Sequence, residues 1–142
     1  MKIIECPRDA MQGISEFIPT DIKAVYINQL LRVGFDTIDF GSFVSPKAIP
    51  QLKDTAQVLA QLDLENTNSK LLSIIANIRG AVDACSFEEI NYLGFPLSVS
   101  EQFQKRNTNK GTDTLHCISW TFYYFHLLII ALLILFTSDG PS

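Results

Sequence analysis

The sequence predicts an α/β fold, in which a mostly parallel sheet of about four strand–helix units is followed by an apolar C-terminal helix. Two observations predict it. Short apolar runs alternate with stretches of helical periodicity in the first part of the chain, which is typical of parallel sheets covered by helices. All Lys and Arg residues, and all but one of the Asp and Glu residues, precede residue 114. We therefore expect two regions, an α/β domain over residues 1–113 and an apolar tail over residues 114–142.

The first strand is expected at the N-terminus, where the run KIIEC covers residues 2–6. The loop that follows contains Pro7 and Gly13. Because proline and glycine interrupt regular structure, we expect no regular helix in this loop.

The first helix is expected over residues 21–33. Thr20 is a candidate N-cap, and Gly34 suits the C-terminal cap. The apolar residues of the helix recur at i, i+3 and i+4 spacing, which predicts one apolar face. This face consists of Ile22, Val25, Tyr26, Leu30 and Val33.

Three further strands are expected over residues 37–40, 71–76 and 90–95. The middle one, LLSIIA, is nearly all apolar, as expected of a strand that helices cover on both faces. Helices are expected between these strands over residues 49–62 and 78–85.

The tail contains an uncharged stretch over residues 118–136, close to the roughly 20 residues that cross a bilayer as a helix. Trp120, Tyr123 and Tyr124 lie near its start, as interfacial aromatic residues do. Basic residues precede it, so the positive-inside rule predicts that the N-terminal domain faces the cytosol. The alternative interpretation is a buried helix or strand pair of a soluble core.

Composition narrows the classes of function. The formal net charge is −4, and the eleven basic residues are scattered, so the sequence has no basic stripe for nucleic acid. The first residues show no uninterrupted apolar run of a secretory signal. The three cysteines follow no metal-binding spacing, which favours reduced thiols at Cys6, Cys85 and Cys117.

Residues directly after the strands of an alternating fold gather at one end of the sheet, where ligands bind. Arg8 and Asp9 follow the first strand. Such a pair can join an anion-binding guanidinium to a metal-binding carboxylate, although it is also typical of a solvated surface. Asp39 ends the second strand and is expected either to cap the next loop or to pair with Arg8. Other candidates after the strands are Gln12, Ser42, Ser45, Lys47, Ser98, Ser100, Glu101 and Asn107.

Three segments resemble 3-hydroxy-3-methylglutaryl-CoA lyase over roughly residues 2–110: ECPRDAMQG, LLRVGFDTIDFGSFVSPKAIPQLKDTAQVL and LGFPLSVSEQFQKRNTNK. The PRD box alone indicates only the wider group of TIM-barrel metallolyases. The string SFVSPK with its following Pro-Gln is the more specific mark.

The resemblance implies a partial (β/α)8 TIM barrel, because a complete barrel takes roughly 250 residues. It implies cleavage of 3-hydroxy-3-methylglutaryl-CoA to acetoacetate and acetyl-CoA, with an acyl-CoA substrate, Mg²⁺ or Mn²⁺ as cofactor and a cytoplasmic location. Residue by residue, Asp9 matches the metal ligand, Arg8 the arginine that stabilises the enolate oxygen, and Asp39 a glutamate near that arginine. The matching substrate-binding residues are Gln12, Ser42 and Ser100.

The sequence departs from the family pattern in two ways. Asp39 is one methylene shorter than the family's glutamate, so its reach to Arg8 requires a structural test. The HxH pair, the asparagine and the Gly-Cys-Pro loop of the family match no stretch of this chain. We therefore expect a truncated or frameshifted lyase that is inactive alone. The alternatives are a tail-anchored, non-enzymatic half barrel that binds or scaffolds a partner, and a homodimer, which would still lack the histidines.

Overall fold

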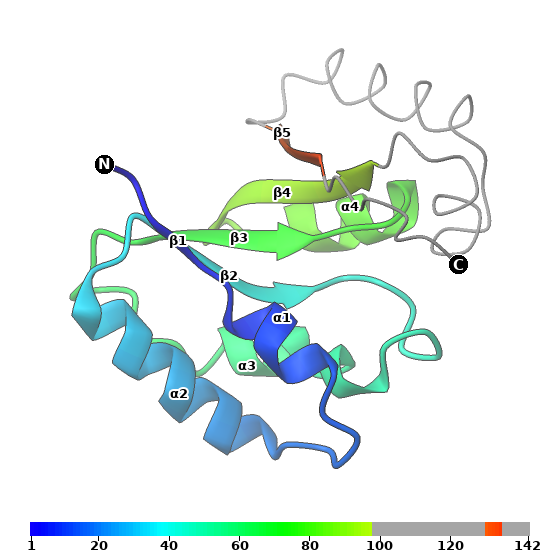
Figure 1. Cartoon of the computed structure of the whole chain (residues 1–142), viewed down its shortest axis with the longest axis horizontal. Coiled ribbons are helices and arrows are strands. Elements are labelled where there is room, and N and C mark those ends of the chain that lie inside the picture. The colour runs from blue at the N-terminus through cyan, green and yellow to red at the C-terminus, as the bar shows by residue number, and fades with distance from the viewer. Residues whose placement is uncertain (98–129, 135–142) are drawn as a thin grey trace, which may run out of the picture.

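The computed structural model describes residues 1–97 and 130–134 (Figure 1). In this part of the chain, five strands form one sheet in the order β1-β2-β3-β4-β5, and every neighbouring pair is parallel. Helices connect the first four strands. The predicted alternation of four parallel strands with helices is confirmed.

Strands β1 to β4 and helices α2 and α4 lie close to the predicted ranges, whereas α1, η1, α3 and β5 differ from the prediction. The strands are β1 (Ile4–Glu5), β2 (Thr37–Ser42), β3 (Lys70–Ile74), β4 (Ile90–Leu97) and β5 (Ile130–Ile134). The helices are α1 (Pro7–Gln12), α2 (Thr20–Val33), α3 (Thr55–Leu59) and α4 (Ile78–Cys85), with the short 3-10 helix η1 (Pro50–Leu52).

The expectation of no helix after the first strand was wrong, because α1 occupies Pro7–Gln12. Pro7 is the first helical residue, a position that needs no N–H donor and suits the fixed φ of proline. Gly13 follows the last helical residue. The two residues that we took as helix breakers therefore mark the ends of a short helix.

The predicted helix over residues 49–62 is divided into η1 and α3. Asp54 separates them with φ −106° and ψ 19°, which is not helical geometry. Its carboxylate accepts hydrogen bonds from Thr20 and Lys23 of α2. The break in the helix allows this carboxylate to face α2. The pattern of apolar residues does not predict the break, because the break depends on a polar contact.

Helix α2 begins one residue before its predicted start. Its N-cap is Pro19, not Thr20, whose hydroxyl donates to Asp54 Oδ2 at 2.7 Å. Gly34 ends the helix as predicted, with φ 81° in the left-handed region that glycine tolerates.

The apolar face predicted for α2 is largely solvent-exposed. Ile22, Val25 and Val33 are 54%, 58% and 68% exposed. The opposite side, with Ala24, Ile27 and Leu31, packs in the core against β2, β3 and α3. The helix carries apolar residues on two sides. Lys23 lies on the buried side, and its ion pair with Asp54 favours the burial of this side.

The core lies between the strands and their helices. Ile38 and Phe40 of β2 pack against α2 and α3, which lie together below the sheet in Figure 1. A second cluster joins α4 to β4 through Ala81, Ala84 and Phe95. Because side chains alternate along a strand, Asp39 lies on the other face of β2 from its two apolar neighbours.

The predicted C-terminal helix over residues 118–136 is wrong at Ile130–Ile134, which form β5 beside β4. A five-residue run of Ile, Leu and Ala suits a strand at the end of a parallel sheet as well as it suits a helix. The rest of the predicted helix lies outside the described residues. Among those described, no helix has the length and apolar character that a bilayer crossing requires.

The close packing of α4 on the segment after β2 provides a test of the fold. A Cβ on Gly80 would overlap the carbonyl oxygen of Phe43, whereas a Cβ on Gly13 would meet nothing within 4 Å. We expect Gly80→Ala to lower the free energy of unfolding by about 1–3 kcal/mol, because the overlap forces α4 away from the backbone of Phe43. Gly13→Ala is the matched control, since Gly13 has φ −83°. Urea unfolding of both variants measures the difference, and equal midpoints would contradict the packing described.

Candidate active site

An ion pair between Arg8 and Asp39 forms the centre of the candidate site. Arg8 Nη2 lies 2.6 Å from Asp39 Oδ2, and Arg8 Nε lies 3.1 Å from the same oxygen and 3.3 Å from Oδ1. The two side chains are 10% and 4% exposed. The pairing anticipated as one of two options for Asp39 is therefore the one that forms, despite the short carboxylate.

The backbone explains why these two side chains meet. Strand β1 pairs with β2, with Glu5 opposite Ile38. Helix α1 starts two residues after Glu5 and packs against β2. Arg8 thus lies in the first turn of α1, close to Asp39 of the neighbouring strand. The prediction that Asp39 ends this strand was wrong, because β2 extends to Ser42.

The remaining nitrogen of the guanidinium gathers two more candidate residues. Arg8 Nη1 donates to Asp9 Oδ1 and to Gln12 Oε1, each at 3.0 Å. Gln12 reaches Arg8 because α1 places residues four apart on one face. The guanidinium of Arg8 therefore brings together four predicted site residues: Arg8, Asp9, Gln12 and Asp39. The first three lie in α1, the helix that the sequence pattern does not predict.

The electrostatics of the site are set mainly by burial. Burial raises the pKa of Asp39, and the hydrogen bonds and positive charge of Arg8 offset part of this effect. Burial also raises the pKa of the Cys6 thiol beside the ion pair, with a smaller contribution from Asp39. A raised thiol pKa disfavours the thiolate, so Cys6 lacks the character of an activated nucleophile.

Ser42 ends β2 three residues beyond Asp39. Its hydroxyl donates to the carbonyl of Ile74 at 3.1 Å, and its N–H donates to Thr55 Oγ1 at 3.2 Å. These contacts tie the end of β2 to β3 and α3. Among the described residues, no hydrogen bond joins Ser42 to the Arg8 group.

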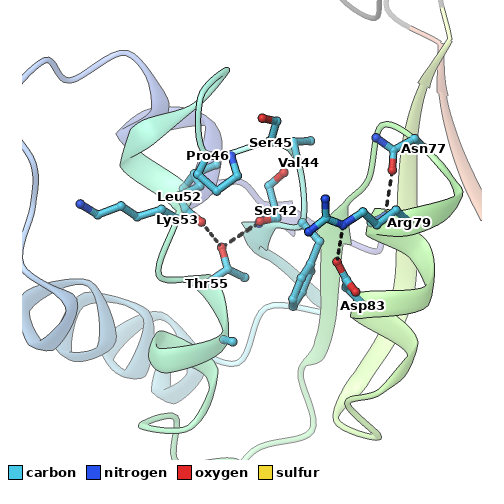
Figure 2. Close-up of a pocket in the computed structure, with 13 residues that line it drawn as sticks. Ser42, Val44, Ser45, Pro46, Leu52, Lys53, Thr55, Asn77, Arg79 and Asp83 are labelled. Atoms are coloured by element: carbon cyan, nitrogen blue, oxygen red, sulfur yellow. Dashed lines mark hydrogen bonds and ion pairs between the residues drawn. The ribbon is translucent and has the colours of Figure 1, made fainter.

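A cavity of about 250 Å³ opens beside Ser42 (Figure 2). The segment after β2 lines it together with residues of η1 and α3, and Asn77 and Arg79 at the start of α4 line the opposite side. The sequence analysis did not single out these two residues. They directly follow β3, so the rule applied to the other strand ends would have found them.

The other candidates make no hydrogen bond to the Arg8 group among the described residues, although Ser45 lines the cavity. Ser45 Oγ accepts the N–H of Lys47 at 3.3 Å, which is a turn contact. Lys47 is exposed. Four candidates lie outside the described residues: Ser98, Ser100, Glu101 and Asn107.

Asp9 and Gln12 offer oxygen donors of the kind that Mg²⁺ and Mn²⁺ prefer. The Asp9 side chain is 70% exposed and therefore accessible to an ion. The described residues nevertheless contain no group of three His, Cys, Asp or Glu residues that could hold one. The residues described here therefore do not by themselves fit a divalent cation.

No protein-family model matches the chain. It is 36% identical over 113 residues to a hydroxymethylglutaryl-CoA lyase of Bacillus subtilis, covering 79% of this chain and 37% of that protein. It is 35% identical over 112 residues to the cytoplasmic 3-hydroxy-3-methylglutaryl-CoA lyase of Rattus norvegicus, covering 77% of this chain and 32% of that protein.

Solved structures agree with these relatives. The HMG-CoA lyase of Acinetobacter baumannii, in complex with coenzyme A and 3-methylmalate, matches with a TM-score of 0.81 and 31% identity, over 88% of this chain and 41% of that one. The HMG-CoA lyase of Bacillus subtilis matches with a TM-score of 0.79 and 34% identity, over 87% of this chain and 41% of that one. The chain thus spans about two fifths of the solved structures it matches.

Removing Arg8 should change the titration of Asp39. In Arg8→Met, the two causes that lower the Asp39 pKa disappear while burial remains, so we expect this pKa to rise further above its ordinary value of about 4. Carboxyl ¹³C NMR titration measures it. Arg32→Met, at an exposed position on α2, is the control and should leave the titration unchanged.

The same variant should change the dependence of stability on pH. When a carboxyl pKa is raised by folding, the folded chain binds more protons than the unfolded chain between the two pKa values, so stability falls as pH rises through that window. Arg8→Met widens the window. We expect its loss of stability to grow with pH up to the new pKa and to reach about 3–5 kcal/mol, the cost of an unpaired buried charge. A loss that is independent of pH would contradict this account.

Proposed function

Because this chain is homologous to hydroxymethylglutaryl-CoA lyases over about four fifths of its length, we propose that it supplies part of the active site of a carbon–carbon lyase of that type. The proposed reaction is cleavage of 3-hydroxy-3-methylglutaryl-CoA to acetoacetate and acetyl-CoA. The observation that carries the proposal is the hydrogen-bonded group of Arg8, Asp9, Gln12 and Asp39, because these residues match the family's site residues.

In this proposal Arg8 stabilises the negative oxygen of the enolate that forms when the carbon–carbon bond breaks. Asp39 acts through Arg8. It holds Nε and Nη2 and so fixes the plane of the guanidinium, whose Nη1 donates to Asp9 and Gln12. In the proposal, the substrate oxygen takes the place of one of these two acceptors of Nη1. A guanidinium fixed in this way loses little freedom when the substrate binds, so its charge is preorganised for the transition state.

Asp9 is proposed as one ligand of the Mg²⁺ or Mn²⁺ expected for this type of lyase. Such an ion, when bound, polarises the substrate hydroxyl as a Lewis acid. Because the described residues do not fit an ion alone, the chain requires further ligands from another polypeptide or from residues beyond those described. We propose that the chain by itself is inactive, because no stretch of its sequence matches the HxH pair, the asparagine or the Gly-Cys-Pro loop of the family.

The proposed substrate is an acyl-CoA, with Gln12, Ser42 and Ser100 as binding residues. The Acinetobacter relative was solved with coenzyme A bound, which supports this class of substrate. The cavity beside Ser42 offers space next to one of these residues (Figure 2).

A second candidate function is a non-enzymatic half barrel that binds or scaffolds a partner. It is favoured by the exposed apolar stripe of α2, defined by Ile22, Val25, Tyr26 and Val33, because a group of exposed large apolar residues marks interaction surfaces. Tail anchoring is part of this alternative. Retention of the full chain in membranes after alkaline carbonate extraction would favour it, whereas release would exclude anchoring.

The lyase proposal can be tested by complementation. The full chain alone should not cleave 3-hydroxy-3-methylglutaryl-CoA in the presence of Mn²⁺. Co-expression with the part of the Bacillus subtilis lyase that this chain does not match should produce chelator-sensitive cleavage. Arg8→Gln should lower kcat of the complemented pair by about 100-fold or more, as expected for the loss of a group that stabilises a developing oxyanion.

Arg32→Gln is the matched control and should keep the activity of the complemented pair. Chelator-sensitive cleavage by the chain alone would contradict the proposed incompleteness. A soluble, associated pair without activity would contradict the proposed lyase function.

A further inference from the structure

Gln51 holds the segment that joins α1 to α2. This residue of η1 is 5% exposed. Its Oε1 accepts the N–H of Ile18 at 2.9 Å, and its Nε2 donates to the carbonyls of Ile14 and Glu16 at 3.0 and 2.8 Å. One side-chain amide therefore satisfies three backbone groups of residues 14–18, a loop segment outside the helices and strands.

The backbone of Gln51 is itself anchored to α2. Lys23 Nζ donates to the carbonyl of Gln51 and lies 2.7 Å from Asp54 Oδ1. Lys23 is 2% exposed, and its amine lies 4.2 Å from the centre of the Phe17 ring, within the held segment. Gln51 is thus fixed from both sides, and it cannot shift without disturbing a buried ion pair.

The held segment is continuous with α1. Ile14 N–H donates to the carbonyl of Met11 at 3.0 Å, and Met11 is buried in the core. Helix α1 has only six residues and also contacts η1. Such a short helix is not stable alone, so its position depends on what fixes its ends.

We propose that Gln51 is a positioning residue of the candidate active site, which fixes residues 14–18 and thereby the position of α1 that presents the Arg8 guanidinium to Asp39. Its relevance to catalysis rests on the proposed function, whereas its effect on Arg8 does not. The Pro-Gln that follows SFVSPK, a family mark without a role in the sequence analysis, acquires one in this way.

A purely structural residue would have a different signature. If Gln51 only contributed to global stability, its replacement would accelerate hydrogen exchange throughout the core by the same factor. A positioning residue changes exchange locally, at the segment it holds and at the side chain it places.

The experiment measures hydrogen exchange by NMR in the full ¹⁵N-labelled chain. Gln51→Met keeps the length of the side chain and removes all three hydrogen bonds. We expect the Ile18 amide and the Arg8 Nε–H to exchange about tenfold faster or more, a factor equivalent to the loss of roughly one net hydrogen bond. The buried amides of β3 should change by a smaller factor. Gln61→Met, at an exposed glutamine after α3, is the control and should change neither probe.

Gln51→Glu provides a second variant if the first does not fold. It keeps an acceptor for the Ile18 N–H but loses both donors to the carbonyls of Ile14 and Glu16, so the Arg8 Nε–H should again exchange faster than in the wild type. Equal acceleration of the β3 amides and the two probes would overturn the proposal. So would faster exchange at Ile18 with an unchanged Arg8 Nε–H. Neither result depends on the complementation assay, so failure of this proposal is distinguishable from failure of the lyase function.

Discussion

The buried ion pair between Arg8 and Asp39 is the interaction on which the candidate site depends. Burying either charge alone is costly. The two charges are tolerated because Arg8 Nη2 lies 2.6 Å from Asp39 Oδ2 and all three nitrogens of the guanidinium donate hydrogen bonds. The pair joins α1 to β2 and sets which nitrogen of Arg8 is left near Asp9 and Gln12. The position of the guanidinium in the candidate site therefore depends on the parallel pairing of β1 with β2.

Lys23, Gln51 and Asp54 form a second polar group. In our proposal this group supports the first by fixing the loop that follows α1. Its hydrogen bonds connect α2, η1 and the loop after α1 directly, through side chains alone. Among the residues described, no buried side-chain nitrogen or oxygen lacks a hydrogen-bond partner. When every buried polar atom is hydrogen-bonded, these side chains have one favourable arrangement, because any alternative leaves a buried polar atom without a partner. The conformation of the loop between α1 and α2 is thus specified by side chains that are distant in sequence.

The relatives that this chain resembles are longer proteins, of which it matches only a part. The chain spans about two fifths of the structures it matches, and its described residues gather an arginine, two carboxylates and an amide but no set of metal ligands. A lyase site of this type draws its ligands from several strand ends. Within the described residues, the position of the guanidinium therefore does not depend on a complete set of metal ligands.

The sequence by itself determined the parallel α/β alternation, most element boundaries and the identity of the candidate residues, because apolar periodicity and strand-end motifs are local signals. It misjudged α1, the buried side of α2, the break before α3 and the strand at Ile130–Ile134. Each of these depends on partners distant in sequence. Helix α1 packs against β2, and β5 pairs with β4. Asp54, at the break before α3, forms an ion pair with Lys23 on the buried side of α2. Only the tertiary structure decided them, since a helix with apolar residues on two sides, or a short apolar run, takes the form that its neighbours stabilise.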